Sequence, residues 1–210
     1  MLSVHRRARR GAYHTENNCE HGAINNCHIF YMICHLFSNN LPINSHKIMR
    51  FDPFQNRLCR KIRNELSESL MGAIHSRDLA PSNAVAQKYA PESAEECINE
   101  YISNRIERYS VIINQIQSTN IAADETYIIV LLLWDKELFF EIHEWLEPKW
   151  LKAKGTEKSI LQAFIQAAGT YILLEYSRDK GARKMAAKAV ATMLKYAKLL
   201  PDFLDTELLI

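Results

Sequence analysis

Apolar residues recur at helical spacing through most of the chain after residue 50. The first stripe repeats every four residues and consists of Leu58, Ile62, Leu66, Leu70 and Ile74. This spacing places them on one face of an amphipathic helix. Asp52-Pro53 is typical of a helix start, with Asp52 as the cap and Pro53 at the first position. The turn-rich residues 76–91, which include Pro81-Ser82-Asn83, are then predicted to form a linker.

A second long stripe follows this predicted linker. Ser93-Ala94-Glu95-Glu96 has the Ser-x-x-Glu spacing of a capping box, which predicts a helix start. Apolar residues then recur over several turns, from Ile98 to Ile116, and residues 118–124 end the helix. The two stripes together predict an N-terminal helical pair over residues 49–120.

Four further helices are predicted in the second half of the chain. They span about 125–134, 138–154, 157–176 and 179–199. Gly155 is predicted to terminate the second of these as its C-cap, and Pro201 stops the last. No strand pattern and no nucleotide-binding glycine loop occurs, so the sequence predicts an all-α protein. Residues 121–210 are predicted to form its bundle of about four helices.

Residues 1–48 differ from the rest of the chain, because they show neither a helical nor a strand period. We interpret them as a disordered tail or as a start assigned too far upstream, since Met49 opens a more regular segment. Cys19, Cys27 and Cys34, each near a histidine, suggest zinc. They lack the Cys-x-x-Cys knuckle of most structural zinc sites, so zinc binding by this segment is not predicted.

Composition and charge exclude several classes of protein. The 210 residues are 48% hydrophobic and 24% charged with a net charge of +2, which does not indicate a broad polyanion-binding surface. A basic turn around Arg57–Arg63 is interpreted as the solvated face of its helix, and a nucleic-acid partner is not favoured. The longest apolar run, 128–134, is too short to cross a membrane. Five cysteines without a paired framework are typical of a reduced, cytoplasmic protein.

The helix predicted over 138–154 carries polar residues inside its apparent apolar stripe. At roughly 100° per residue, one arc of about a third of the circumference holds Phe139, His143, Leu146, Glu147 and Trp150. We expect this arc to face inward. Glu141 and Trp145 then point the other way, with Glu141 in solvent. Trp145 is covered by the N-terminal helices or belongs to a partner surface.

A buried polar cluster is expected where this helix meets the next. His143 and Glu147 lie four residues apart, as do Gln162 and Gln166 on the following helix. Buried polar groups need partners, so the two pairs are expected to face one another. Trp150 is expected to pack over the cluster, and Glu144 to approach it from the rim.

Three interpretations of this cluster remain open. It forms a purely structural network that fixes the register of the bundle. Alternatively, His143, Glu147 and Glu144 ligate a divalent metal such as zinc, iron or manganese. In the third interpretation, His143 and Glu147 act as a metal-free base and its orienting carboxylate, with Gln162 and Gln166 stabilising an oxyanion.

The motif resembles that of a bacterial and archaeal helical family, domain-of-unknown-function family 309. The resemblance rests on His143-x-x-x-Glu147-x-x-Trp150, on the flanking residues 134–144 and 160–166, and on Gly181-Ala182, and it covers roughly 125–205. It implies a helical fold and a metal-binding role for the motif, but no established reaction. Some relatives carry a histidine where this chain has Ile172 and Leu173, which puts a third ligand from that helix in doubt.

Two hypotheses about function follow. In the first, the protein binds a divalent metal or small ligand through the cluster and acts as a metal-dependent hydrolase. In the second, it is a non-catalytic interaction module in which the cluster is structural and the amphipathic N-terminal helices dock a partner or a second copy of the chain. The sequence does not indicate a substrate or an oligomeric state.

Overall fold

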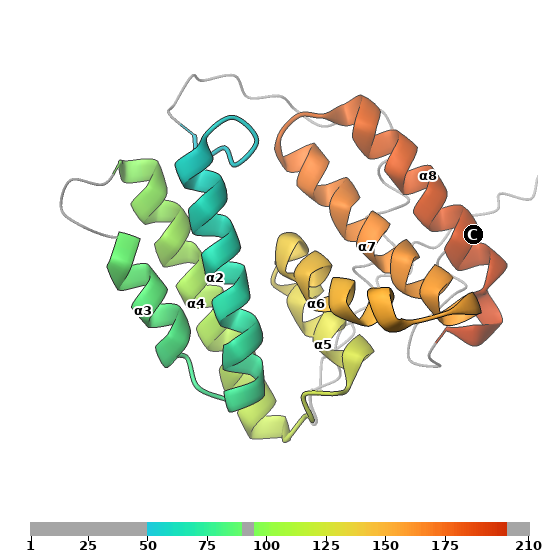
Figure 1. Ribbon diagram of the computed structural model, residues 1–210, viewed down its shortest axis with the longest axis horizontal. Helices are drawn as coiled ribbons and strands as arrows, with labels where there is room; N and C mark the ends of the chain where they lie inside the picture. The colour runs from blue at the N-terminus through green and yellow to red at the C-terminus, as the bar shows by residue number, and fades with distance from the viewer. Residues whose placement is uncertain (1–49, 90–94, 201–210) are drawn as a thin grey trace, which may run out of the picture.

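The computed structural model describes residues 50–89 and 95–200, and these residues form seven α-helices and a short 3-10 helix without a strand (Figure 1). The elements are α2 (Arg57–Ser76), α3 (Ala80–Tyr89), α4 (Glu96–Thr119), α5 (Thr126–Asp135), α6 (Phe139–Lys152), α7 (Gly155–Glu175), α8 (Asp179–Lys195) and η1 (Ala197–Leu199). The all-α prediction is confirmed. The tail predicted over 1–48 lies outside the described residues. None of the described helices is both long and apolar enough to cross a membrane.

α2 begins later than the sequence suggested. Asn56 is its N-cap, and its Oδ1 accepts hydrogen bonds from the backbone amides of Leu58 at 2.7 Å and Cys59 at 3.2 Å. The Asp52 side chain instead accepts from the amide of Phe54 at 2.8 Å, inside a turn that precedes the helix. The predicted start at Asp52-Pro53 is therefore wrong by one turn, because Asp52 stabilises the turn and Asn56 caps the helix.

We expect Asn56→Ala to lower the free energy of unfolding by about 1 kcal/mol, because two backbone amides lose their acceptor. Chemical denaturation followed by circular dichroism measures this change. Asn114→Ala is the matched control, since Asn114 is exposed in the middle of α4 and caps no helix. Equal stability of the Asn56→Ala variant and the parent would show that the cap contributes nothing.

The linker predicted over 76–91 is wrong, because it contains the helix α3. Pro81 lies in the first turn of α3, where its missing amide hydrogen costs no intrahelical hydrogen bond. Asp78 prepares this start by accepting a hydrogen bond from the amide of Ala80 at 3.0 Å. The N-terminal part therefore has three described helices rather than a pair.

Polar contacts hold α3 against α2. The buried Ser69 hydroxyl donates to Ser82 of α3 at 3.0 Å. Further along, Glu65 of α2 accepts from Lys88 at 2.6 Å and from the Tyr89 hydroxyl at 2.8 Å. The apolar stripe of α2 is buried as predicted, apart from Leu58, which is exposed.

α4 lies beside α2 and α3 and buries the predicted stripe, including Ile98, Ile102 and Ile116. It begins at Glu96 with Glu95 as N-cap and without a side-chain cap hydrogen bond. The helix start predicted at Ser93 is therefore wrong, and Ser93 itself lies outside the described residues. The helix ends at Asn120, whose φ of 53° is left-handed.

The C-terminal helices follow one another in space as they do in sequence, with α5 on α6, α6 on α7 and α7 on α8. α6 ends at Lys152 with Ala153 as its C-cap, so Gly155 does not terminate α6 as predicted. Gly155 is the first residue of α7, with a left-handed φ of 58° that glycine adopts without strain. Deeper in the bundle, a Cβ on Gly169 would lie 2.6 Å from the sulfur of Met185, so glycine permits the close approach of α7 and α8.

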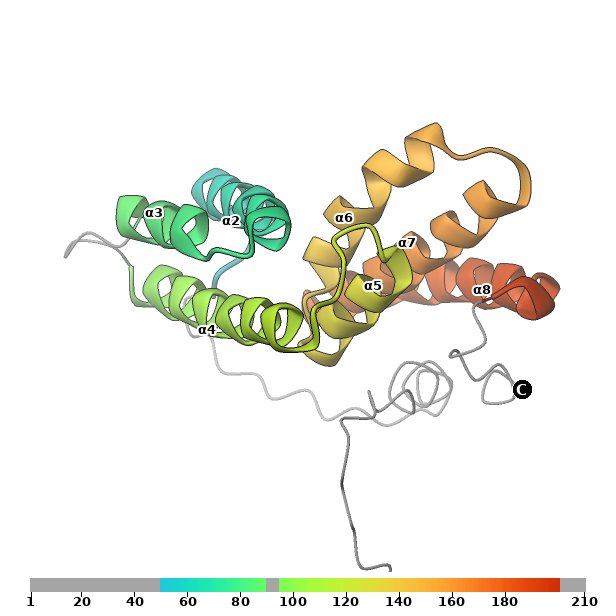
Figure 2. The same cartoon turned by 90° about the horizontal axis from the view of Figure 1, so that it is seen from below.

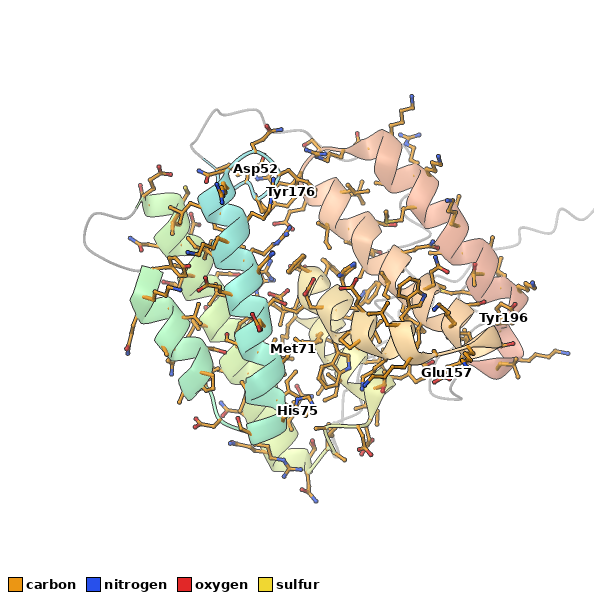
Figure 3. All side chains as sticks on the ribbon, in the orientation of Figure 1. Asp52, Met71, His75, Glu157, Tyr176 and Tyr196 are labelled. Carbon is orange, nitrogen blue, oxygen red and sulfur yellow. The ribbon has the colours of Figure 1, made fainter. Side chains whose placement is uncertain are left out.

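Two groups of helices share one continuous core. Figure 2 shows α2, α3 and α4 on one side and α5 to α8 on the other. Their buried apolar residues nevertheless form a single cluster that runs from Phe51 to Leu200. A second connection joins the turn before α2 to the end of α7, where Phe54 packs edge-on to Tyr176 with ring centroids 5.2 Å apart. Figure 3 labels Tyr176 close to Asp52 of that turn.

Candidate metal centre

The orientation of α6 differs from the prediction. Its buried residues are Glu141, Ile142, Trp145 and Leu146, and the exposed fraction is 0% for Glu141 and 4% for Trp145. The His143 side chain remains 36% exposed. The predicted inward arc is therefore wrong, because the buried face is rotated by roughly a third of a turn relative to it.

Both residues that the sequence placed outward are covered. Trp145 packs against α2, where the ring of His75 lies 5.6 Å from the Trp145 ring, so the N-terminal helices cover it. Glu141, which was expected to lie in solvent, is instead fully buried. A buried carboxylate needs a partner, and α4 provides that partner, as described below.

The face of α6 that remains accessible brings together three potential metal ligands. One ligand atom each from His143, Glu144 and Glu147 lies within 4.8 Å of the other two. His143 Nδ1 and Glu144 Oε1 are 3.2 Å apart. Positions i, i+1 and i+4 of a helix fall within about 100° of one another, which explains the convergence. Glu144 thus belongs to the group rather than to its rim.

An arginine and an aromatic ring border this group. The Phe140 ring is nearly parallel to the His143 ring, with centroids 6.2 Å apart. The Arg63 guanidinium of α2 lies over the Phe140 ring at 3.7 Å. Burial lowers the pKa of Arg63, and negative groups including Glu144 oppose this change. A positive charge is therefore held beside the carboxylates in the contact between α2 and α6.

Among the described residues, no hydrogen bond joins His143 to either of the two predicted glutamines. Gln162 and Gln166 line a pocket between α7 and α8 together with Lys188 and Thr192 of α8. Trp150, the third predicted supporting residue, is half-buried, with the ammonium of Lys158 lying 4.5 Å from its ring centroid. The side chains that could ligate a metal therefore receive no hydrogen bond from Gln162 or Gln166 among the described residues.

A buried charged network lies behind α6, and the sequence analysis missed it. Glu141 Oε1 accepts a hydrogen bond from the Tyr109 hydroxyl at 2.6 Å. Its Oε2 lies 3.8 Å from Nη1 of Arg105, whose side chain is 9% exposed. Both Tyr109 and Arg105 belong to α4. The network therefore joins the first group of helices to the helix that carries the metal-ligand candidates.

The pKa directions show why this pair persists in the interior. Burial is the largest single effect and opposes the charged form of Arg105, but the Glu141 carboxylate and the neighbouring tyrosines Tyr101 and Tyr109 together outweigh it, so the pKa of Arg105 is raised. Burial first and the Glu141 charge second raise the pKa of Tyr109 well above its usual range. Tyr109 is therefore a neutral donor and Arg105 a cation at neutral pH, and both stabilise the Glu141 carboxylate.

The fold and these side chains define an all-α protein with an accessible histidine–glutamate cluster on one helix of a bundle. Residues 128–185 match the model of a family described as Domain of unknown function (DUF309). The match extends from α5 into α8 and includes the whole of α6. It confirms the resemblance seen in the sequence. No curated protein and no solved structure matches the chain.

Proposed function

We propose that this protein binds a divalent metal ion through His143, Glu144 and Glu147 and uses it as a metal-dependent hydrolase. The observation that carries the proposal is the convergence of an imidazole and two carboxylates within 4.8 Å on an accessible face of α6. Among the described residues, this is the one group of three such side chains that meets this closely. One nitrogen and two oxygen ligands suit zinc, iron or manganese.

The residues fit such an ion. Metal–ligand bonds of about 2.0–2.2 Å place two ligand atoms up to about 4.4 Å apart, so small side-chain rotations complete the site. The His143 and Glu144 side chains are free to make them, because they are 36% and 35% exposed. All three ligands come from one rigid helix, and three protein ligands leave at least one coordination position open.

An ion held by His143, Glu144 and Glu147 would supply Lewis acidity to a substrate or to water. The neighbouring chain then has two tasks. Arg63, already held beside Glu144 by its contact with Phe140, offers a positive charge for an anionic group of the substrate. The buried contact between Glu141 and Tyr109 fixes the rotation of α6 and thereby the direction of the three ligands.

Metal content tests the proposal directly. We expect the full-length protein, reconstituted with zinc or manganese and desalted, to retain one equivalent more metal than the His143→Ala variant. Elemental analysis measures this difference. His75→Ala is the matched control, because His75 is the other histidine among the described residues and lies exposed on α2. Metal held elsewhere in the chain is common to the parent and both variants, so it cancels in the difference.

Equal metal content in the parent and the His143→Ala variant would contradict the proposal, provided that circular dichroism shows the variant to be folded. Glu147→Gln gives a second reading, since it keeps the shape of the side chain and removes its charge. Hydrolysis that persists after chelation and in both variants would separate any activity from this site.

A further inference from the structure

A pocket of about 360 Å³ lies between α7 and α8, and the proposed metal site does not use it. Its polar lining consists of Ser159, Gln162 and Gln166 from α7 and Lys188, Thr192 and Lys195 from α8. Tyr196, which follows α8, completes the wall. Within residues 50–89 and 95–200, no aspartate or glutamate lines this pocket. The lining therefore offers hydrogen-bond donors and positive charge to whatever occupies it.

The helical spacing explains how these side chains converge. Ser159, Gln162 and Gln166 lie at i, i+3 and i+7 on one face of α7. Lys188 and Lys195 are seven residues apart and share a face of α8 in the same way. Ala191 lies between the two lysines and lines the pocket, so a small side chain leaves room in its centre. Two lysines thus border one space.

The distribution of charge gives an independent observation. The whole chain has a net charge of only +2. Residues 178–198, in contrast, contain seven lysines and arginines and a single acidic residue, Asp179. Of these seven cations, Lys188 and Lys195 line the pocket. The pocket therefore lies in the most positive segment of an almost neutral chain.

At one corner of the pocket Lys195 and Ser159 lie beside Tyr196. The proximity first of Lys195 and then of Ser159 lowers the pKa of Tyr196. The Lys195 ammonium also lies 5.0 Å from the centroid of the Tyr196 ring. Figure 3 labels Tyr196 at the end of the bundle where α7 begins, close to Glu157 of the first turn. These contacts hold one of the two lysines at the pocket wall.

We propose that this pocket binds the phosphate group of a small molecule. Lysine binds phosphate as a point charge, and the two amides and the hydroxyls supply hydrogen bonds to the rest of the ligand. A volume of about 360 Å³ lies within the range of small-molecule sites, which suits a ligand the size of a phosphorylated sugar. A site for a nucleic-acid backbone would instead use the basic residues along the whole of α8.

Pyrophosphate is the probe, titrated by isothermal calorimetry into the full-length protein in the presence of a chelator. We expect saturable binding of one pyrophosphate. The double variant Lys188→Gln/Lys195→Gln should lose about tenfold or more in affinity. The matched control is Lys184→Gln/Lys198→Gln, which removes the same charge from exposed positions outside the pocket and should retain the affinity.

Binding must also persist in the His143→Ala variant, which distinguishes this pocket from the proposed metal site. A small phosphorylated sugar should compete with pyrophosphate. The proposal is overturned if saturable binding is absent in the millimolar range, or if both double variants lose the same affinity. It is also overturned if a single-stranded oligonucleotide binds and weakens equally in both double variants, since that result assigns the charge to a nucleic-acid surface.

Discussion

Glu141→Ala is expected to lower the free energy of unfolding by about 3–5 kcal/mol, because it leaves the charge of Arg105 buried without its partner. Glu141 is fully buried, and its two oxygens face the Tyr109 hydroxyl at 2.6 Å and Arg105 Nη1 at 3.8 Å. Glu141→Gln should cost less, since it keeps the volume and an acceptor for Tyr109. Urea denaturation measures both changes.

An exposed ion pair between the same parts of the chain provides the control. Glu137 lies 3.4 Å from Arg108 of α4, and its side chain is 63% exposed. Exposed pairs contribute little, so Glu137→Gln should change the free energy of unfolding by less than about 1 kcal/mol. If Glu137→Gln and Glu141→Gln had equal effects, burial would not be the cause.

A double variant separates the cost of a lone charge from the loss of the network. Replacing a buried ion pair by apolar residues of similar volume is often neutral. Glu141→Leu with Arg105→Met should therefore be markedly more stable than either single variant. If the two losses added instead, Glu141 and Arg105 would not be coupled, and the lone buried charge would not be the cause of the cost.

The sequence carried a signal for this network that the sequence analysis did not use. Along α4, the buried residues Ile98, Ile102, Tyr109, Ile112 and Ile116 alternate in steps of three and four, and Arg105 falls on that repeat. An arginine at a core position requires a buried anion. The buried Leu138, which is the N-cap of α6, forms the same kind of repeat with Ile142, Trp145 and Leu146 of that helix, and Glu141 lies on its edge. Reading both repeats would have paired Glu141 with Arg105.

The wrong face of α6 was predicted to be buried, because two faces of this helix carry apolar residues. Aromatic residues such as Phe139 and Trp150 suggested one buried face, whereas both are only partly buried. The contact with α2 decides the orientation, and a contact between helices far apart in sequence is not visible in local spacing. The presence of a helix depends on local periodicity. Every described helix except α3 was therefore predicted from the sequence.

α3 was missed for a related reason. Ser82 is its one buried residue, and its apolar side chains Val85, Ala86 and Tyr89 pack against the core but stay partly exposed, so the apolar pattern of this short helix is weak. The proposed metal ligands, in contrast, could be named from the sequence. His143, Glu144 and Glu147 were named from the sequence because their spacing is local, and the structure brings them together on one helix. Gln162 and Gln166 line a pocket with residues of α8, a contact that could not be predicted because local spacing does not show which face of α7 meets α8.

Trp145→Ala is expected to destabilise the protein by about 3–5 kcal/mol, the usual cost of removing a buried aromatic side chain. Trp145 is 4% exposed and packs against His75 of α2, so its loss opens a cavity between the two groups of helices. Chemical denaturation followed by circular dichroism measures the loss. Trp150→Ala is the matched control and should cost less, because Trp150 is only half-buried.

We also expect the unfolding transition of the Trp145→Ala variant to remain cooperative. Because the two groups of helices share one core, Trp145→Ala should lower stability in a single cooperative transition rather than uncouple two units. Trp145→Phe should cost much less, since it refills most of the space and removes an indole N–H that has no hydrogen-bond partner among the described residues. A Trp145→Ala variant as stable as the parent but altered in its association with other molecules would instead make Trp145 part of a partner surface, and the cover that α2 provides would then be incidental to folding.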